Sequence, residues 1–118
     1  MAIHPIEFRY GTEEMKEVFG EKHRFHSIIE AEIALARAEA SVGMIPQPDA
    51  DYISAHAKNA SLERSKEIEN EIHHDMMAVV RAVSEVCGEA GRWIHYGATS
   101  NDILDTATGL QIRDALDI

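Results

Sequence analysis

The sequence has 118 residues, of which 45% are hydrophobic, and its 21 acidic and 11 basic residues give a net charge of −10. This length and composition predict one folded domain with a modest core and exclude a disordered chain. The excess of acid excludes nucleic acids and anionic membranes as general partners, and without a membrane-length apolar run or a signal-peptide pattern we expect a cytoplasmic protein.

The first eleven residues are expected to form an extended arm, because Pro5 disfavours helix in the residue before it. The arm ends in Arg9 and Tyr10. Arginine offers paired donors that match phosphate oxygens and tyrosine adds a hydroxyl donor, although such a pair near a terminus is by itself most often incidental. Thr12 is placed to cap a short helix that ends at Phe19.

The longest helical run is predicted over residues 21–42, with Gly43 as its C-terminal stop. Pro48 then suits the first turn of a short helix over residues 49–58. Alanines in the long run allow another helix to approach closely. The apolar positions of this run repeat at helical spacing and comprise Phe25, Ile28, Ile29, Ile33, Ala36 and Ala40.

Two helices of opposite character are predicted next. Ser61 can cap a helix over residues 62–72, whose few apolar side chains indicate a surface position. Residues 76–90 instead carry a continuous apolar stripe, which predicts the central core helix. Cys87 lies on that stripe, so it is interpreted as a packed thiol rather than a nucleophile, and a lone cysteine forms no intrachain disulfide.

After a loop predicted over residues 88–98, a last helical run starts at Ile103, with Ala107 and Leu110 on the same face. No segment alternates apolar and polar residues as a strand would, so the fold class is all-α, with five or six helices. The last residue, Ile118, follows no helix stop signal, and we expect the natural protein to continue beyond it.

Four consecutive residues that can cap a helix, from Thr99 to Asp102, precede this last helix. A helix start with free N–H groups and neighbouring hydroxyls is a natural site for a carboxylate or phosphate. Arg92 and His95 add potential positive charge nearby. The alternative is a well-capped helix after a tight loop, with Trp93 as a packing anchor.

His73, His74 and Asp75 are the second unusual group. On a continuous helix neighbouring side chains point about 100° apart, so the two histidines cannot both face one ligand. An aspartate beside a histidine can fix its tautomer, whereas the alternative is two solvated histidines at a helix start. Glu71 and His74 have the spacing of di-iron helical bundles, but the motif occurs once, and this argues against a metal site.

These segments together resemble the adenylosuccinate lyase family of the fumarase/aspartase superfamily. The resemblance covers the whole chain and depends on the Arg9-Tyr10 pair, residues 69–78 with their His74-Asp75, and residues 92–106. It implies an N-terminal helical domain over residues 1–118 of a longer enzyme. Such enzymes cleave a C–N bond by β-elimination, releasing fumarate from adenylosuccinate to leave AMP, or from the succinyl-carboxamide ribotide of purine synthesis.

The resemblance also implies roles for particular residues. Arg9 and Tyr10 would contact the nucleotide phosphate, with His95 near it. The substrate-binding set implied in full is Arg9, Tyr10, His73, His74, Asp75, His95, Thr99 and Ser100, with Thr99 and Ser100 holding a carboxylate of the succinyl group. The general acid and the general base would lie beyond Ile118. The implied enzyme is a homotetramer that needs no cofactor and no metal.

One departure from the family is visible at His73, where the family often has lysine or arginine. A fixed positive charge is there replaced by one that titrates. Two rival functions stay open at this point, namely a stand-alone helical module that binds an anionic metabolite or partner, and a small metal-binding helical protein.

Overall fold

The computed structural model describes residues 11–118, and over that range all its regular structure is helical. This confirms the predicted all-α class and the expectation of five or six α-helices for the described residues. The elements are α2 (Glu13–Val18), α3 (Glu21–Ser41), α4 (Gln47–His56), the 3₁₀ turn η1 (Ala57–Asn59), α5 (Leu62–Ile72), α6 (Asp75–Val86), the 3₁₀ helix η2 (Gly88–Trp93) and α7 (Ser100–Leu116).

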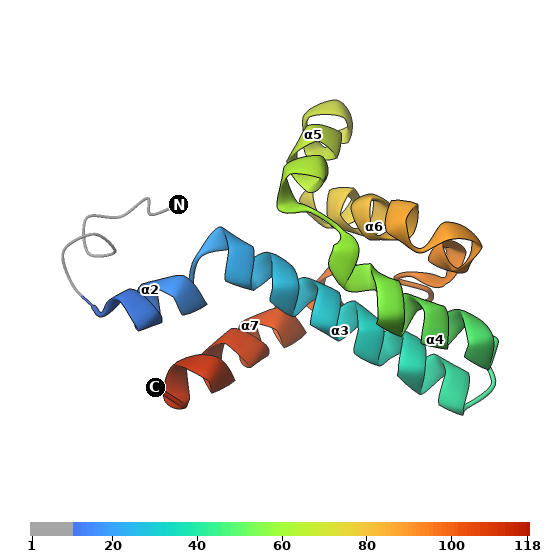
Figure 1. Cartoon of the computed structure of the whole chain (residues 1–118), viewed down its shortest axis with the longest axis horizontal. Coiled ribbons are helices and arrows are strands. Elements are labelled where there is room, and N and C mark those ends of the chain that lie inside the picture. Colours follow the sequence, from blue (N-terminus) through green and yellow to red (C-terminus); the bar gives the residue numbers. More distant parts are fainter. Residues whose placement is uncertain (1–10) are drawn as a thin grey trace.

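Helix α3 is the axis of the domain. Figure 1 shows it crossing the molecule with α7 and α4 packed along it, while α5 and α6 lie together beyond α4. Its buried Phe25, Ile29 and Ala36 join residues of α4, α6 and α7 in one core. The sequence placed residues 76–90 at the centre; α3 takes that position because it is longer and buries side chains against two helices at once.

Helix α6 is shorter than the sequence predicted. It ends at Val86 rather than Ala90, and the chain continues as η2 to Trp93, so the first half of the expected loop is helical. The reason is Gly88, whose φ of +58° breaks the α-helix. Ala90 is still buried, and Cys87 is packed as predicted, with burial raising the pKa of its thiol to about 11.

Helix α5 covers α6 from the surface, as predicted from its polarity. Ile68 is completely buried, in a small cluster with Ala78 and Ala82 of α6. Outside that cluster, Arg64 donates two hydrogen bonds of 2.9 Å to the carboxylate of Glu85. The helix therefore packs through one apolar row and exposes most of its remaining surface.

The helix caps and helix-end residues predicted from the sequence are present in the structure. The hydroxyls of Thr12 and Ser61 accept from backbone N–H groups at 3.2 and 3.1 Å and cap α2 and α5. Gly43 follows α3 with a φ of +81°, and Pro48 lies in the first turn of α4. Within the described part of the chain, no helix combines the length and the apolar character needed to cross a membrane.

Replacement of Gly91 by alanine tests the packing of η2 on α6. A Cβ at Gly91 would lie 2.6 Å from the carbonyl oxygen of Ser84 and 2.9 Å from its Cα. Because backbone atoms cannot yield as a side-chain tip can, we expect Gly91→Ala to lower the free energy of unfolding by about 1–3 kcal/mol in urea titrations.

Gly109→Ala is the matched control, because it lies in α7 with nothing within 4 Å of its Cβ position. Alanine is the better helix former there and should add about 0.5–1 kcal/mol. Equal effects of the two substitutions would contradict the close contact between η2 and α6.

Candidate functional site

The two histidines predicted as site residues lie in the break between α5 and α6. His73 ends α5 in the left-handed region, with φ of 55°, and His74 is the N-cap of α6. The expectation that they lie 100° apart on one helix is therefore wrong, because the left-handed residue turns the chain between them. Both side chains are exposed, as is Asp75.

The imidazole of His74 has a defined role in this junction. Its Nδ1 accepts a hydrogen bond of 3.1 Å from the N–H of Met77. An accepting nitrogen carries no proton, so the neutral ring holds its proton on Nε2. His74 thus caps α6 with one nitrogen and presents an N–H donor with the other. The Asp75 carboxylate makes a different contact, because its Oδ1 accepts a hydrogen bond of 2.8 Å from the N–H of Met76.

The start of α7 is the second part of the candidate site. Thr99 is the N-cap, and Asp102 accepts a hydrogen bond of 3.0 Å from the Thr99 N–H, as a capping box requires. Ser100 is the first helical residue, three positions earlier than the predicted start at Ile103. The Thr99 N–H is taken by Asp102, and the Asp102 N–H donates to the Thr99 carbonyl at 3.2 Å. The N–H groups of Ser100 and Asn101, with the two hydroxyls, are therefore the ones that can face an anion.

The turn that leads into α7 is tightly bent. His95 has a φ of 63° and Gly97 a φ of 76°, both in the left-handed region. For His95 this conformation is unfavourable and requires support from its surroundings. The buried Ile94 anchors the turn on one side. On the other side His95 Nδ1 lies 2.7 Å from Oε1 of Glu32.

Glu32 is the most unusual charged residue of the described chain, because its side chain is fully buried on α3. Burial raises the pKa of this carboxyl, and hydrogen bonding and the charge of His95 oppose the rise. Glu39 lies about two turns further along α3 and is also buried. Its pKa is raised by burial and by the negative charge of Glu32.

Both acids lie beneath the turn that precedes α7. Glu32 contacts His95, and Oε2 of Glu39 lies 3.8 Å from the Cβ position of Gly97. In the described structure the second oxygen of Glu32 and Oε1 of Glu39 have no hydrogen-bond partner. Sequence reasoning missed both residues, although a signal existed: glutamates at core positions of an otherwise apolar helical face.

Trp93 anchors the other flank of this turn. Its Nε1 donates a hydrogen bond of 2.8 Å to Asp49 of α4, and its ring makes an edge contact with Tyr96 at 5.1 Å between centroids. The guanidinium of Arg92 lies 5.4 Å from the centre of the same ring. The interpretation of Trp93 as a packing anchor agrees with these contacts, and Arg92 lies against the tryptophan.

A groove of about 260 Å³ runs between α3, α5, α6 and α7. Asp75 and Leu104 both line it, so it connects the α5–α6 junction with α7. Arg24 also lines it and donates to Thr108 and Gln111 of α7 at 2.7 and 2.8 Å. These bonds tie α3 to α7 and fix a positive charge beside the groove, which the sequence reasoning did not anticipate.

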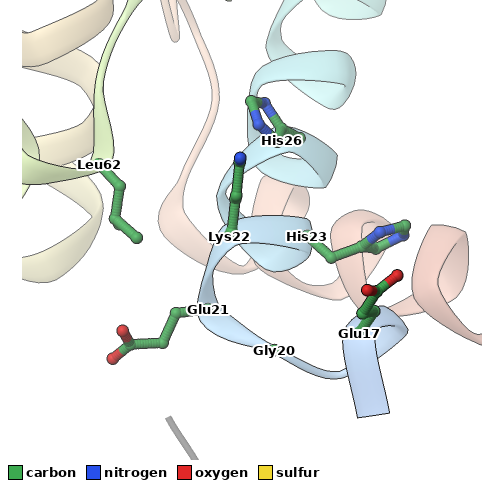
Figure 2. Close-up of a pocket in the computed structure, with 7 residues that line it drawn as sticks. All are labelled: Glu17, Gly20, Glu21, Lys22, His23, His26 and Leu62. Carbon is green, nitrogen blue, oxygen red and sulfur yellow. The ribbon is translucent and has the colours of Figure 1, made fainter. Parts of the chain in front are cut away.

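A second hollow, between α2 and the start of α3, is less suited to a ligand. Figure 2 shows Glu17 and His23 on one side of it, with Lys22 and His26 toward Leu62. His23 is held by Asp114 at 2.8 Å, and Glu21 by Lys66 at 2.8 Å. These side chains are engaged in contacts between helices, so we interpret the hollow as part of the helix packing rather than as a ligand site.

The predicted site residues therefore fall into two groups in the described range. His73, His74 and Asp75 lie at the α5–α6 junction, while His95, Thr99 and Ser100 lie at the start of α7. Arg9 and Tyr10 lie outside the described residues. Residues 11–118 contain no cluster of three or more His, Cys, Asp or Glu side chains placed to hold a metal ion.

Comparison with known proteins identifies the family. The family described as Lyase matches residues 7–118. The chain belongs to this lyase family. Over its whole length it is 57% identical to an adenylosuccinate lyase from Pyrococcus horikoshii and 44% identical to an N-acetyl-S-(2-succino)cysteine lyase from Dickeya dadantii. It spans 27% and 28% of those two proteins.

The solved structures agree with the sequence comparison. A fumarate lyase from Mesorhizobium sp. BNC1 superposes with a TM-score of 0.81 and 38% identity, over 92% of this chain and 27% of that one. The helical arrangement of Figure 1 is thus the arrangement found in one segment of a longer lyase. The resemblance predicted from residues 69–78 and 92–106 is confirmed at the level of the family.

The buried acids predict a characteristic dependence of stability on pH. The pKa of Glu39 is higher in the folded than in the unfolded chain. The stability that it contributes is therefore present below the unfolded pKa and is lost as the pH rises through the folded value. We expect Glu39→Gln to become progressively more stable than the parent as the pH rises from about 4.5 to 8.

Urea titrations of both proteins across that pH range measure the difference. Glu30→Gln, at an exposed position on the same helix, is the matched control. A stability difference between Glu39→Gln and the parent that stays constant with pH would contradict a raised pKa for Glu39.

Proposed function

We propose that this chain is the N-terminal part of an adenylosuccinate lyase, which cleaves adenylosuccinate to AMP and fumarate in purine biosynthesis. The observation that carries the proposal is the 57% identity to the Pyrococcus horikoshii enzyme over the whole chain. The same enzyme would release fumarate from the succinyl-carboxamide ribotide. A stand-alone binding module is less favoured, because the similarity to lyases extends across both candidate segments.

The start of α7 is proposed to hold a carboxylate of the succinyl group. The N–H groups of Ser100 and Asn101 at this helix start, with the hydroxyls of Thr99 and Ser100 beside them, favour a negative ligand. The carboxylate of Asp102 neutralises part of this effect, since it accepts from Thr99. His95, largely buried beside this turn, would lie near the nucleotide phosphate.

The α5–α6 junction is proposed to contact the other end of the substrate. His74 would donate from Nε2, because Nδ1 is occupied by the N–H of Met77. Asp75 lines the groove that leads toward α7. His73 lies where the family often has lysine or arginine, and Arg9 and Tyr10 would contact the phosphate.

The chain by itself is proposed to bind without catalysing. β-Elimination needs a base that removes a carbon-bound proton and an acid that protonates the leaving nitrogen. Both groups are expected in the part of the enzyme that corresponds to the remaining length of the relatives. The whole enzyme would be a cytoplasmic homotetramer without a cofactor, and its site would combine residues from more than one subunit.

A chimera tests this proposal directly. The 118 residues replace the matching 27% of the Pyrococcus horikoshii enzyme, and fumarate release from adenylosuccinate is followed by absorbance. We expect turnover by the chimera and none by the 118-residue chain. Loss of either proton-transfer group typically costs a hundredfold to ten-thousandfold, and loss of positioning adds to this.

Ser100→Ala in the chimera tests the carboxylate contact. Loss of a hydrogen bond to a charged group costs about 1.5–3 kcal/mol, so kcat/KM should fall roughly tenfold to a hundredfold. Thr106→Ala is the matched control, because its hydroxyl donates to a carbonyl within the same helix. An active chimera unaffected by Ser100→Ala would exclude this contact. A folded chimera that cleaves only N-acetyl-S-(2-succino)cysteine would assign the chain to the second kind of relative.

A further inference from the structure

Glu32 is a carboxylate in a place where carboxylates are rarely found. It is fully buried on the inner face of α3, among the apolar side chains of the core. An uncompensated charge there is strongly disfavoured, and replacement by an apolar residue of similar size is often neutral or stabilising. Stability of the helix alone therefore does not account for an acid at this position.

The side chain of Glu32 makes a hydrogen bond of 2.7 Å to the imidazole of His95. Its other oxygen is unpartnered. The bond reaches across 63 positions in sequence and joins the longest helix to the bent turn before α7. It thus connects the core to the second half of the candidate site.

The contact with Glu32 bears on which nitrogen of His95 carries a proton. When Glu32 is ionised its carboxylate only accepts hydrogen bonds, so the short contact then places a proton on Nδ1. Nε2, on a different edge of the ring, is then left for the ligand. The ring retains 11% of its side-chain exposure, whereas Glu32 has none. A ligand can therefore reach His95 but not Glu32.

The backbone of His95 supports the same interpretation. A histidine at φ of 63° needs an external constraint, and the buried carboxylate supplies one at the side chain. Glu39, close to Gly97, lies beneath the next bend but makes no contact with the imidazole in the described hydrogen bonds. Both acids are thus buried on α3, but among the described hydrogen bonds only Glu32 contacts His95.

We propose that Glu32 is a positioning residue, whose carboxylate fixes the ring orientation and the Nδ1–H tautomer of His95 so that Nε2 faces the substrate. This proposal rests on the proposed function, because it gives His95 its task in the lyase site. Glu32 itself contacts no substrate. Its effect reaches the reaction through the histidine.

The first test determines the tautomer of His95 in the 118-residue chain and does not depend on an activity assay. Nitrogen-15 NMR of the imidazole at about pH 8 should show a proton on Nδ1 of His95 in the parent chain and in Glu39→Gln. Glu32→Met, which keeps the volume and removes the acceptor, should lose this pattern. A parent spectrum with Nδ1 unprotonated, or an unchanged pattern in Glu32→Met, would overturn the proposal.

The second test measures kcat/KM of chimera variants at equal concentrations of folded protein. Glu32→Met should lower kcat/KM roughly tenfold to a hundredfold, by analogy with the loss of partners that orient metal-binding histidines. Glu32→Gln should recover part of the loss, because its carbonyl can accept the same bond, and Glu39→Gln should stay within about twofold. A merely structural role would change the yield of folded protein but not its kcat/KM, and that result would also overturn the proposal.

The two tests separate the proposals. A chimera that folds but is inactive would contradict the proposed function and, with it, the proposed role of His95 in that function. The NMR result would then still establish whether Glu32 fixes the imidazole. An active chimera in which Glu32→Met has no effect would retain the function and reject the role of Glu32.

Discussion

The contact between the Glu32 carboxylate and His95 is the constraint on which the arrangement of the candidate site depends. Helix α3 packs against α4 and α7 and is the longest helix of the described domain. The turn before α7 contains two left-handed residues and would be poorly determined by local preferences alone. One short bond to a buried acid relates this turn to the core. Burial of the Glu32 carboxylate is unfavourable, but its contact with His95 fixes the position of the turn from which α7 begins.

The remaining candidate groups lie where helices begin or end. His73 ends α5, His74 caps α6, and Thr99 caps α7. Helix ends leave backbone donors and acceptors without intrahelical partners, so polar ligands find hydrogen-bonding groups there that helix interiors do not offer. The apolar faces of the same helices, buried in one core, hold these ends in position. Membership of the lyase family assigns this arrangement to a known scaffold, of which the chain represents about a quarter.

Much of the fold could be predicted from the sequence, because helical periodicity and caps are local. Ser61, Gly43 and Pro48 marked helix ends correctly. The errors arose where local signals compete: Gly88 ended α6 early, and a left-handed His73 separated two histidines expected on one helix. The Glu32–His95 pair could not be predicted, since its members are 63 residues apart. Only the position of glutamates on an apolar face hinted at buried partners.

Titration of the ¹⁵N-labelled chain with succinate, at constant ionic strength and with uncharged succinamide as the control, tests most directly whether the α7 start is a preformed carboxylate site. We expect saturable shifts of the backbone amides of Ser100 and Asn101 with succinate only, and smaller shifts at His95. Shifts confined to the hollow around Lys22 and His26, or identical shifts with succinamide, would contradict this expectation.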